Sequence, residues 1–131
     1  DLSVSQDGNT IAVGSYREAS NSKGVNGDQG DTSAEGAGAV FVFTRTNSVW
    51  AQQSYVKASN TEKNDRFGLN VDLSGDGKTL AVGAHRESGR GYASASSTSS
   101  SQSSSSASSV AEGELDQNDN SAEVSGAVYL F

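Results

Sequence analysis

The sequence lacks cysteine, proline and methionine altogether across its 131 residues. Without cysteine the chain forms no disulfide and no thiolate metal site, although this says little about its compartment. Basic residues are few, and the net charge of −7 argues against nucleic acid as a partner. No apolar run approaches the ~20 residues of a membrane-spanning helix. The chain also starts without methionine, as we expect of a mature or excised piece of a longer product.

What the sequence does contain is an internal repeat. Residues 2–18 match residues 71–87 at nine of 17 positions, and residues 28–43 match residues 116–131 at ten of 16. The two offsets differ by 19 residues, which are inserted in the second copy. The length fits a single domain, 1–131. It divides into repeat one (1–58) and repeat two (65–131), and repeat two carries a serine-rich insertion over 88–111.

Each repeat is predicted to consist of β-strands. Short apolar runs follow Asp7-Gly8 and Asp76-Gly77, and an Asp-Gly pair between strand-like runs is a strong hairpin signal. The expected strands are A at 2–5 and 70–74, B at 10–15 and 79–84, C at 38–43 and 126–131, and D at 49–58. Strand C is apolar on both faces and is expected to be buried on both. The chain therefore runs A-B-C-D-A-B-C and has no second strand D.

Four-stranded antiparallel units in tandem are typical of a β-propeller. The residues of repeat two and of strand D carry a further resemblance, and they are Phe67-Gly68, Gly83-Ala84, Gly126-Ala127-Val128-Tyr129, Trp50, Gln52, Gln53 and Tyr55. The chain resembles the FG-GAP repeat of integrin-α-like β-propellers, in particular the bacterial extracellular variety. The proline of the "GAP" position is absent from both copies.

The resemblance implies an all-β fold of about two propeller-type blades of four antiparallel strands. Propellers of this family close with about seven blades, so two blades predict an incomplete propeller or an open array. The strand left without a D partner exposes backbone N–H and C=O groups. A neighbouring chain that covered this edge would give a homo-oligomer, either a ring or a filament.

Calcium is the one cofactor that the resemblance implies, because the family often holds it in the loop between strands A and B. Closely spaced carboxylates supply the oxygen ligands that calcium prefers. A second acidic set precedes each strand C, in the shared pattern D-Q-x-D-x-S-A-E. The candidate ligands are Asp72, Asp76, Asp28, Asp31, Asp116 and Asp119. The alternative is structural, with Asp-Gly hairpin turns and Asx turns in which the carboxylates bind the loop backbone.

No catalytic constellation is visible, and we do not expect an enzyme. His85 is the only histidine, and repeat one has Tyr16 in its place, so the position does not require an imidazole. There is no nucleophile–base pair and no Gly-rich phosphate loop before a helix.

Other recurrent residues are interpreted structurally. Arg17-Glu18 and Arg86-Glu87 end strand B in each repeat and predict an ion pair or a loop anchor. The aromatic residues Trp50, Tyr55 and Phe67 are expected to pack between sheets, and a sugar-stacking platform is the alternative for one of them.

The run from Ser94 to Ser109 contains twelve serines and one threonine. Repeat alignment places it between strands B and C, where repeat one has a shorter loop. Such a composition buries no apolar surface, so it predicts either a bare flexible loop or a loop covered by O-linked glycans. The candidate glycosylation sites are Ser96, Ser97, Thr98, Ser99, Ser100, Ser101, Ser103, Ser104, Ser105 and Ser106.

These features favour a non-enzymatic structural or adhesive β-repeat module, extracellular or at the cell surface, that self-assembles through open strand edges. Two alternatives stay open. One is a calcium-dependent or carbohydrate-binding module, and the other is a fragment of a larger closed propeller. The expected partners are copies of the same chain and glycans.

Overall fold

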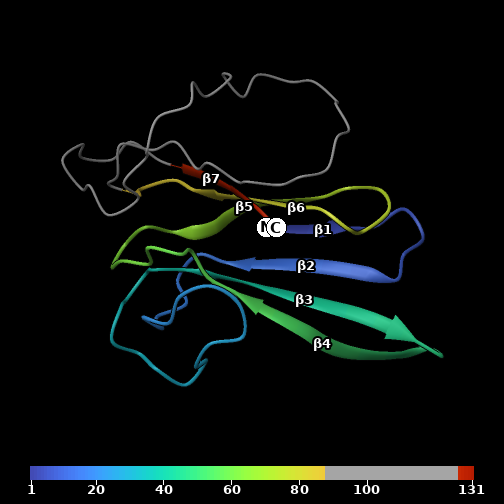
Figure 1. Cartoon of the computed structure of the whole chain (residues 1–131), viewed down its shortest axis with the longest axis horizontal. Coiled ribbons are helices and arrows are strands. Elements are labelled where there is room, and N and C mark those ends of the chain that lie inside the picture. The colour runs from blue at the N-terminus through green and yellow to red at the C-terminus, as the bar shows by residue number, and fades with distance from the viewer. Residues whose placement is uncertain (88–126) are drawn as a thin grey trace.

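The computed structural model describes residues 1–87 and 127–131, which form two open antiparallel sheets and no helix. The first sheet has the order β1 (Leu2–Val4), β2 (Thr10–Ser15), β3 (Ala39–Thr46) and β4 (Val49–Val56). The second has the order β5 (Phe67–Leu73), β6 (Leu80–Ala84) and β7 (Ala127–Leu130). Figure 1 shows the two sheets stacked one on the other. The all-β fold and the strand order A-B-C-D-A-B-C are therefore confirmed.

Each sheet has two distinct faces, because side chains alternate along a strand. We define the front face by Leu2, Val4, Ile11 and Val13 in the first sheet. The rear face of the first sheet carries Ala12, Val40 and Val42; in the strand register Ala12 lies opposite Val42, and Val40 lies opposite Gly14. By the same register, the front face of the second sheet carries Val71, Leu73, Leu80 and Val82, and its rear face carries Ala81, Val128 and Leu130.

The hydrophobic core lies where the rear face of the first sheet packs on the front face of the second. Its buried side chains include Val40 in β3, Phe67 and Val71 in β5, Val82 in β6 and Tyr129 in β7. The ring of Phe67 meets that of Tyr129 edge-on, with centroids 5.3 Å apart. The two sheets thus stack as successive blades, and each contributes one face to a single core.

Strand β5 begins earlier than the sequence predicts. Its pairing with β6 shifts between Phe67 and Asn70, which leaves Gly68 and Leu69 as a bulge inside the strand. Gly68 has a φ of +81°, a left-handed conformation that favours glycine. This bulge brings the carbonyl of Gly68 so close to Gly14 that any side chain on Gly14 would collide with it. The Phe-Gly pair therefore serves close packing of the two sheets.

Strand β3 departs from the expectation that strand C is buried on both faces. Ala39 and Val40 are fully buried, but Phe41 to Thr44 are half-buried and Arg45 is exposed. The second sheet covers only the first part of β3, so the strand emerges from the core along its length (Figure 1). The expectation held for the start of the strand and was wrong for the rest.

Candidate functional site

The apolar faces at the two ends of the sheet stack are exposed, whereas the equivalent faces between the two sheets are buried. Val40 on the rear face of the first sheet is 0% exposed, whereas its repeat equivalent Val128 on the second sheet is 61% exposed. On the front faces, Leu2 is 58% exposed, whereas its equivalent Val71 is 7% exposed. Equivalent positions carry similar residues, so the difference arises from whether another sheet lies on them. The chain therefore presents an uncovered front face at one end and an uncovered rear face at the other.

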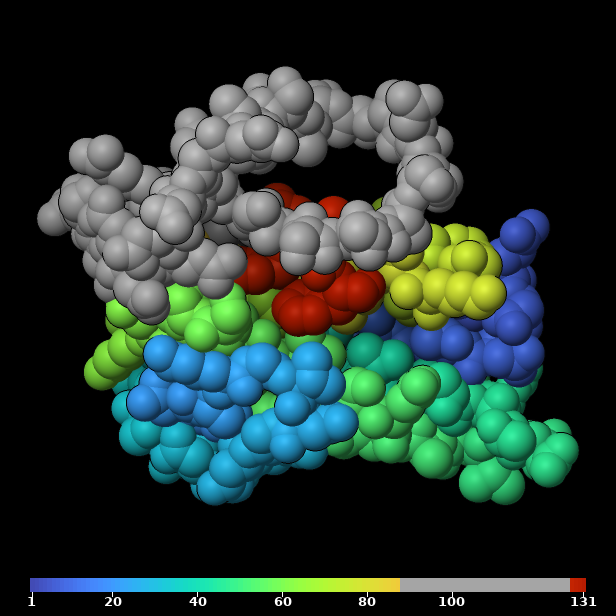
Figure 2. Space-filling model, viewed as in Figure 1, coloured from blue at the N-terminus to red at the C-terminus, as the bar shows by residue number. Residues whose placement is uncertain are grey.

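Strand β7 is also an open edge within the described part of the chain. It pairs with β6 on one side, and none of the described residues forms a strand on its other side. Residues 127–131, red in Figure 2, reach the molecular surface. In the first sheet the corresponding strand β3 is covered on that side by β4. The open edge thus occupies the place where strand D was predicted to be missing.

The outer edge of β4 is protected in part by its own repeat. Residues 24–26 of the loop between β2 and β3 run beside it and form a β-bridge between Val25 and Val56. The amide of Asn26 donates to the carbonyl of Tyr55 at 2.7 Å, and that of Lys57 donates to the carbonyl of Gly24 at 2.8 Å. Covering an edge with a loop prevents unwanted pairing. Among the residues that the structure describes, the hairpin end of β4 has no strand or loop bridged to its outer edge.

Side chains of Asp1 and of Ser3 in β1 bond to the backbone of β5 and fix the two sheets in register. The carboxylate of Asp1 accepts the amide of Val71 at 2.9 Å, and the hydroxyl of Ser3 accepts the amide of Leu73 at 2.9 Å. These bonds satisfy part of the unpaired edge of β5. Ser3 also donates to the carboxylate of Asp72 at 3.2 Å, which gives this predicted calcium ligand a structural contact.

A buried ion pair lies between the loop after β2 and the end of β4. The ammonium of Lys57 has no solvent exposure and donates to the carboxylate of Glu18 at 2.7 Å. Burial lowers the pKa of Lys57, and the Glu18 charge opposes this shift. The predicted ion pair at Glu18 thus exists, but its cation is Lys57 and not the adjacent Arg17, whose guanidinium lies over the ring of Tyr16.

A second buried polar group joins the two sheets. Glu87, the repeat equivalent of Glu18, accepts the amide group of Asn60 at 2.7 Å and the hydroxyl of Tyr129 at 3.3 Å. Tyr129 also donates to the carbonyl oxygen of Asn60 at 2.6 Å, and burial raises its pKa. The carboxylate of Asp65 is buried nearby, and burial, together with the Glu87 charge, raises its pKa to about 7. This network positions the linker between the repeats.

Two of the predicted calcium ligands are Asp72, in β5, and Asp76, in the turn that follows this strand. Asp76 accepts the hydroxyl of Ser74 at 2.6 Å and the amide of Lys78 at 3.1 Å, and these bonds lower its pKa. Asp7 makes the same turn in repeat one, with Ser5 as the 2.6 Å donor. This is the hairpin-turn geometry of the structural alternative.

The other two described candidates, Asp28 and Asp31, lie in the loop between β2 and β3. Asp31 accepts the amide of Asn21 at 2.7 Å and the hydroxyl of Ser33 at 2.9 Å, and these bonds lower its pKa. Asp28 accepts the amide of Gly30 at 2.8 Å. In residues 1–87 and 127–131, no three Asp, Glu or His side chains come together as a metal-binding group. Calcium binding stays a prediction.

The remaining site predictions fall outside the described residues. They concern Asp116, Asp119, the insertion 88–111 and the candidate glycosylation sites between Ser96 and Ser106.

The predicted burial of the three aromatic residues is confirmed for two of them and wrong for the third. Tyr55 and Phe67 are fully buried, as expected. Trp50 is exposed at the β3–β4 hairpin, where the guanidinium of Arg45 lies over its ring at 5.4 Å, so its predicted place between sheets is wrong. His85 is exposed.

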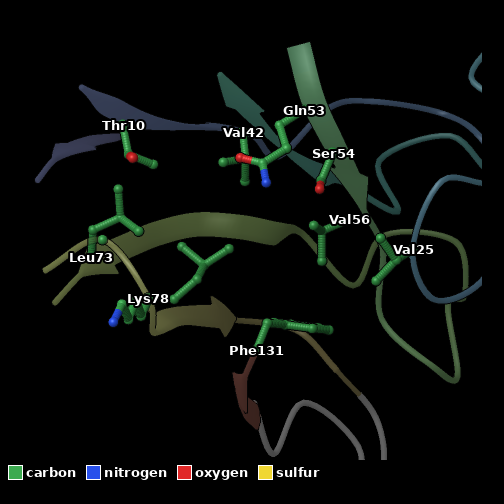
Figure 3. A pocket seen from close by; sticks show the side chains of 11 residues that line it. Thr10, Val25, Val42, Gln53, Ser54, Val56, Leu73, Lys78 and Phe131 are labelled. Carbon is green, nitrogen blue, oxygen red and sulfur yellow. The ribbon is translucent and has the colours of Figure 1, made fainter. Parts of the chain in front are cut away.

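An apolar cavity of about 190 Å³ lies between the sheets. Figure 3 shows Val42 and Val56 of the first sheet facing Leu73 and Phe131 of the second, with Lys78 at one side. Gln53, the extra residue of a bulge in β4, also lines it. The cavity belongs to the packing between sheets and contains no group that would perform chemistry.

Comparison with known proteins finds one family similar to this chain. Residues 50–99 match the family model described as FG-GAP repeat. This part of the chain is similar to an FG-GAP repeat. The match begins at Trp50 and takes in β5 and β6, so it covers the segment in which the two sheets are joined. Searches of curated proteins and of solved structures gave no match. FG-GAP repeats are typically non-catalytic β-repeat modules and usually occur in extracellular domains. Within the described residues, no helix has the length and apolar character needed to cross a membrane.

Proposed function

We propose that this FG-GAP chain is a non-enzymatic extracellular structural or adhesive module that assembles head to tail with further copies of itself. The observation that carries the proposal is the unequal burial of equivalent residues at the two ends of the sheet stack. Val128 is exposed where Val40 is buried, and Leu2 is exposed where Val71 is buried. Exposed apolar surface of this kind, at a defined face, is typical of an interaction site.

A second copy is the occupant that best fits these faces. The rear face of the first sheet already accepts the front face of the second sheet within each chain. The front face of another copy offers Leu2 for Val71, Val4 for Leu73 and the β2 residues Ile11 and Val13 for the β6 residues Leu80 and Val82. The internal contact is therefore a template for the contact between chains. In repeat proteins each repeat contacts only its neighbours, and an end without a polar capping repeat can accept a further repeat.

The geometry of such a contact predicts its products. A front face on a rear face is a heterologous contact, so it gives a ring if the rotation closes and a filament if it does not. The outer edge of β7, which is unpaired within the described residues, borders the rear face and would offer backbone groups to a strand of the neighbouring copy. Adhesion would follow from the repeated display of the loops between strands.

The decisive experiment uses one charged substitution on each face. Leu130→Lys places an ammonium on the rear face, and Val4→Lys places one on the front face; both side chains are about half exposed, so the fold should tolerate them. Val49→Lys at the β3–β4 hairpin is the matched control, because Val49 is exposed away from both uncovered faces. Light scattering and electron microscopy of the wild type should show rings or filaments that grow with concentration.

Each face variant alone should be monomeric, the Val49 control should assemble, and an equimolar mixture of the two face variants should stop at dimers. That last result distinguishes a head-to-tail contact from any symmetric one, because only one intact front and one intact rear remain to pair. A folded, monodisperse wild-type monomer at every concentration would refute the assembly proposal.

We propose further that the serine-rich run 94–109 carries O-linked glycans. Its clustered hydroxyls support this, as does its place between two strands of one sheet. Intact-mass spectrometry of the chain from its native source measures it directly. A mass equal to that of the sequence would rule the glycans out.

A further inference from the structure

A polar cleft of about 370 Å³ lies at the end of the sheets opposite the β3–β4 hairpin. Two loops form it, the one between β2 and β3 and the linker between β4 and β5. Its lining residues are Tyr16, Arg17, Glu35, Gly36, Asn64 and Arg66. None of them belongs to the front or rear faces, so the cleft is independent of the proposed assembly. Its volume is in the range of small-ligand sites.

The floor of the cleft is held rigidly by backbone hydrogen bonds between the two loops. The amide of Asn64 donates to the carbonyl of Glu35, and that of Arg66 donates to the carbonyl of Gly36, both at 3.0 Å. Asn64 and Arg66 have φ values of +71° and +59°, left-handed conformations that are uncommon for residues other than glycine. Backbone held in such conformations is concentrated at functional sites.

The two guanidinium groups of the cleft have no acidic partner within the described residues. Glu18, next to Arg17, is bonded to Lys57 at 2.7 Å. Glu35 lies 3.8 Å from Lys63, and its side chain is largely exposed. Arg17 contacts only the face of the Tyr16 ring, at 5.6 Å, and Arg66 is half-buried. Within residues 1–87 and 127–131, neither arginine is therefore ion-paired, and the one carboxylate that lines the cleft, that of Glu35, lies near Lys63.

We propose that this cleft binds an acidic sugar through its carboxylate. Guanidinium groups bind planar carboxylates by paired, charge-assisted hydrogen bonds, which gives both arginines a role. The Tyr16 hydroxyl and the Asn64 amide line the same cleft and offer partners for sugar hydroxyls. The volume accommodates one such sugar unit in addition to its carboxylate.

The test uses the whole chain and ligand-observed saturation-transfer NMR, which works for a monomer and for a filament alike. Sodium glucuronate should bind measurably at concentrations up to about 20 mM, since sites with few contacts have millimolar dissociation constants. Glucose and acetate, at matched ionic strength, should each bind at least ~10-fold more weakly, a difference of ~1.4 kcal/mol.

Arg17→Gln and Arg66→Asn should each weaken glucuronate binding at least ~10-fold. Asparagine is chosen because it tolerates the left-handed backbone at position 66. Arg45→Gln removes the same charge from the far hairpin and should leave the dissociation constant unchanged. Absence of glucuronate binding, equal binding of glucose or acetate, or equal weakening by Arg45→Gln would each overturn the proposal, provided circular dichroism shows the variants folded.

Discussion

Asp65 should make the protein less stable as the pH rises from about 4 to 7, and Asp65→Asn should remove this effect. The side chain is 3% exposed, and its carboxylate accepts the amide of Glu62 at 2.6 Å. Burial, with the nearby charges of Glu87 and Glu62, raises its pKa from 3.8 to about 7. The folded protein therefore keeps a proton that the unfolded chain has lost, so unfolding releases a proton in this window.

The magnitude follows from the size of the shift. Each pH unit between the two pKa values is equivalent to ~1.4 kcal/mol, so ionised Asp65 costs up to about 4 kcal/mol above pH 7 and nothing below about pH 4. Asparagine keeps the shape and the acceptor for the Glu62 amide without the charge. At pH 8 we therefore expect the variant to be about 2–4 kcal/mol more stable than the wild type, and at pH 4 the two should be alike.

Urea unfolding followed by circular dichroism measures this, at one fixed low protein concentration, because assembly would add its own stabilisation. Asp72→Asn is the matched control, since it removes an exposed carboxylate from the neighbouring strand. If Asp65→Asn and the wild type show the same slope of unfolding free energy against pH, or if the variant is the less stable protein at pH 8, the reasoning about burial is wrong.

Three further predictions concern the buried polar groups and calcium. Lys57→Met should lower the free energy of unfolding by about 3–5 kcal/mol, because the buried Glu18 carboxylate is left without its cation. The double variant with Glu18→Gln should recover part of this loss. Urea unfolding measures both variants, and equal stability of Lys57→Met and the wild type would contradict a stabilising ion pair. Tyr55→Phe should leave the free energy of unfolding unchanged or higher, because the buried Tyr55 hydroxyl lies beside Ser20 and Glu18 without a hydrogen bond to any described residue. Burial raises the pKa of this hydroxyl to about 12. A loss of more than ~1 kcal/mol in the free energy of unfolding would show that the variant removes a hydrogen bond. Millimolar calcium should raise the melting temperature and EDTA should lower it if the predicted calcium ligands bind the ion, and a melting temperature that neither changes would contradict calcium binding.

The strands could be predicted because their signals are local. Alternation of apolar and polar residues sets which side chains share a face, and the Asp-Gly pairs at Asp7-Gly8 and Asp76-Gly77 set the turns. Both signals occur twice in the chain, so each repeat supported the interpretation of the other. The predicted start of β5 at residue 70 was wrong, because the strand begins at Phe67 with a bulge at Gly68 that serves packing between sheets and leaves no periodic pattern.

The buried ionic network could not be predicted in the same way. Lys57 lies near the end of predicted strand D, 49–58, where nothing in the sequence marks it as buried, yet its ammonium is fully buried against Glu18. The only signal was the recurrence of Glu18 as Glu87, which indicates a shared structural role but not the partner. The prediction that Trp50 packs between sheets failed for the opposite reason. A large aromatic residue in a strand indicates the core, but Trp50 lies at the hairpin, beyond the part of the first sheet that the second sheet covers.

The uncovered faces also set how strong an assembly should be. Fully burying an aliphatic side chain contributes ~1.5–3 kcal/mol. Leu2, Val4, Val128 and Leu130, each about half exposed, therefore contribute together about 3–6 kcal/mol per contact. Association costs at least ~4 kcal/mol in lost freedom of motion, so these side chains alone would hold two copies only weakly. Stable assembly therefore needs the backbone groups at the open edge of β7 as well, and it should depend steeply on concentration. One lysine at Leu130 removes about a quarter of the side-chain contribution, ~1 kcal/mol, which is comparable to the whole surplus, and it also adds a charge, so it is enough to abolish assembly.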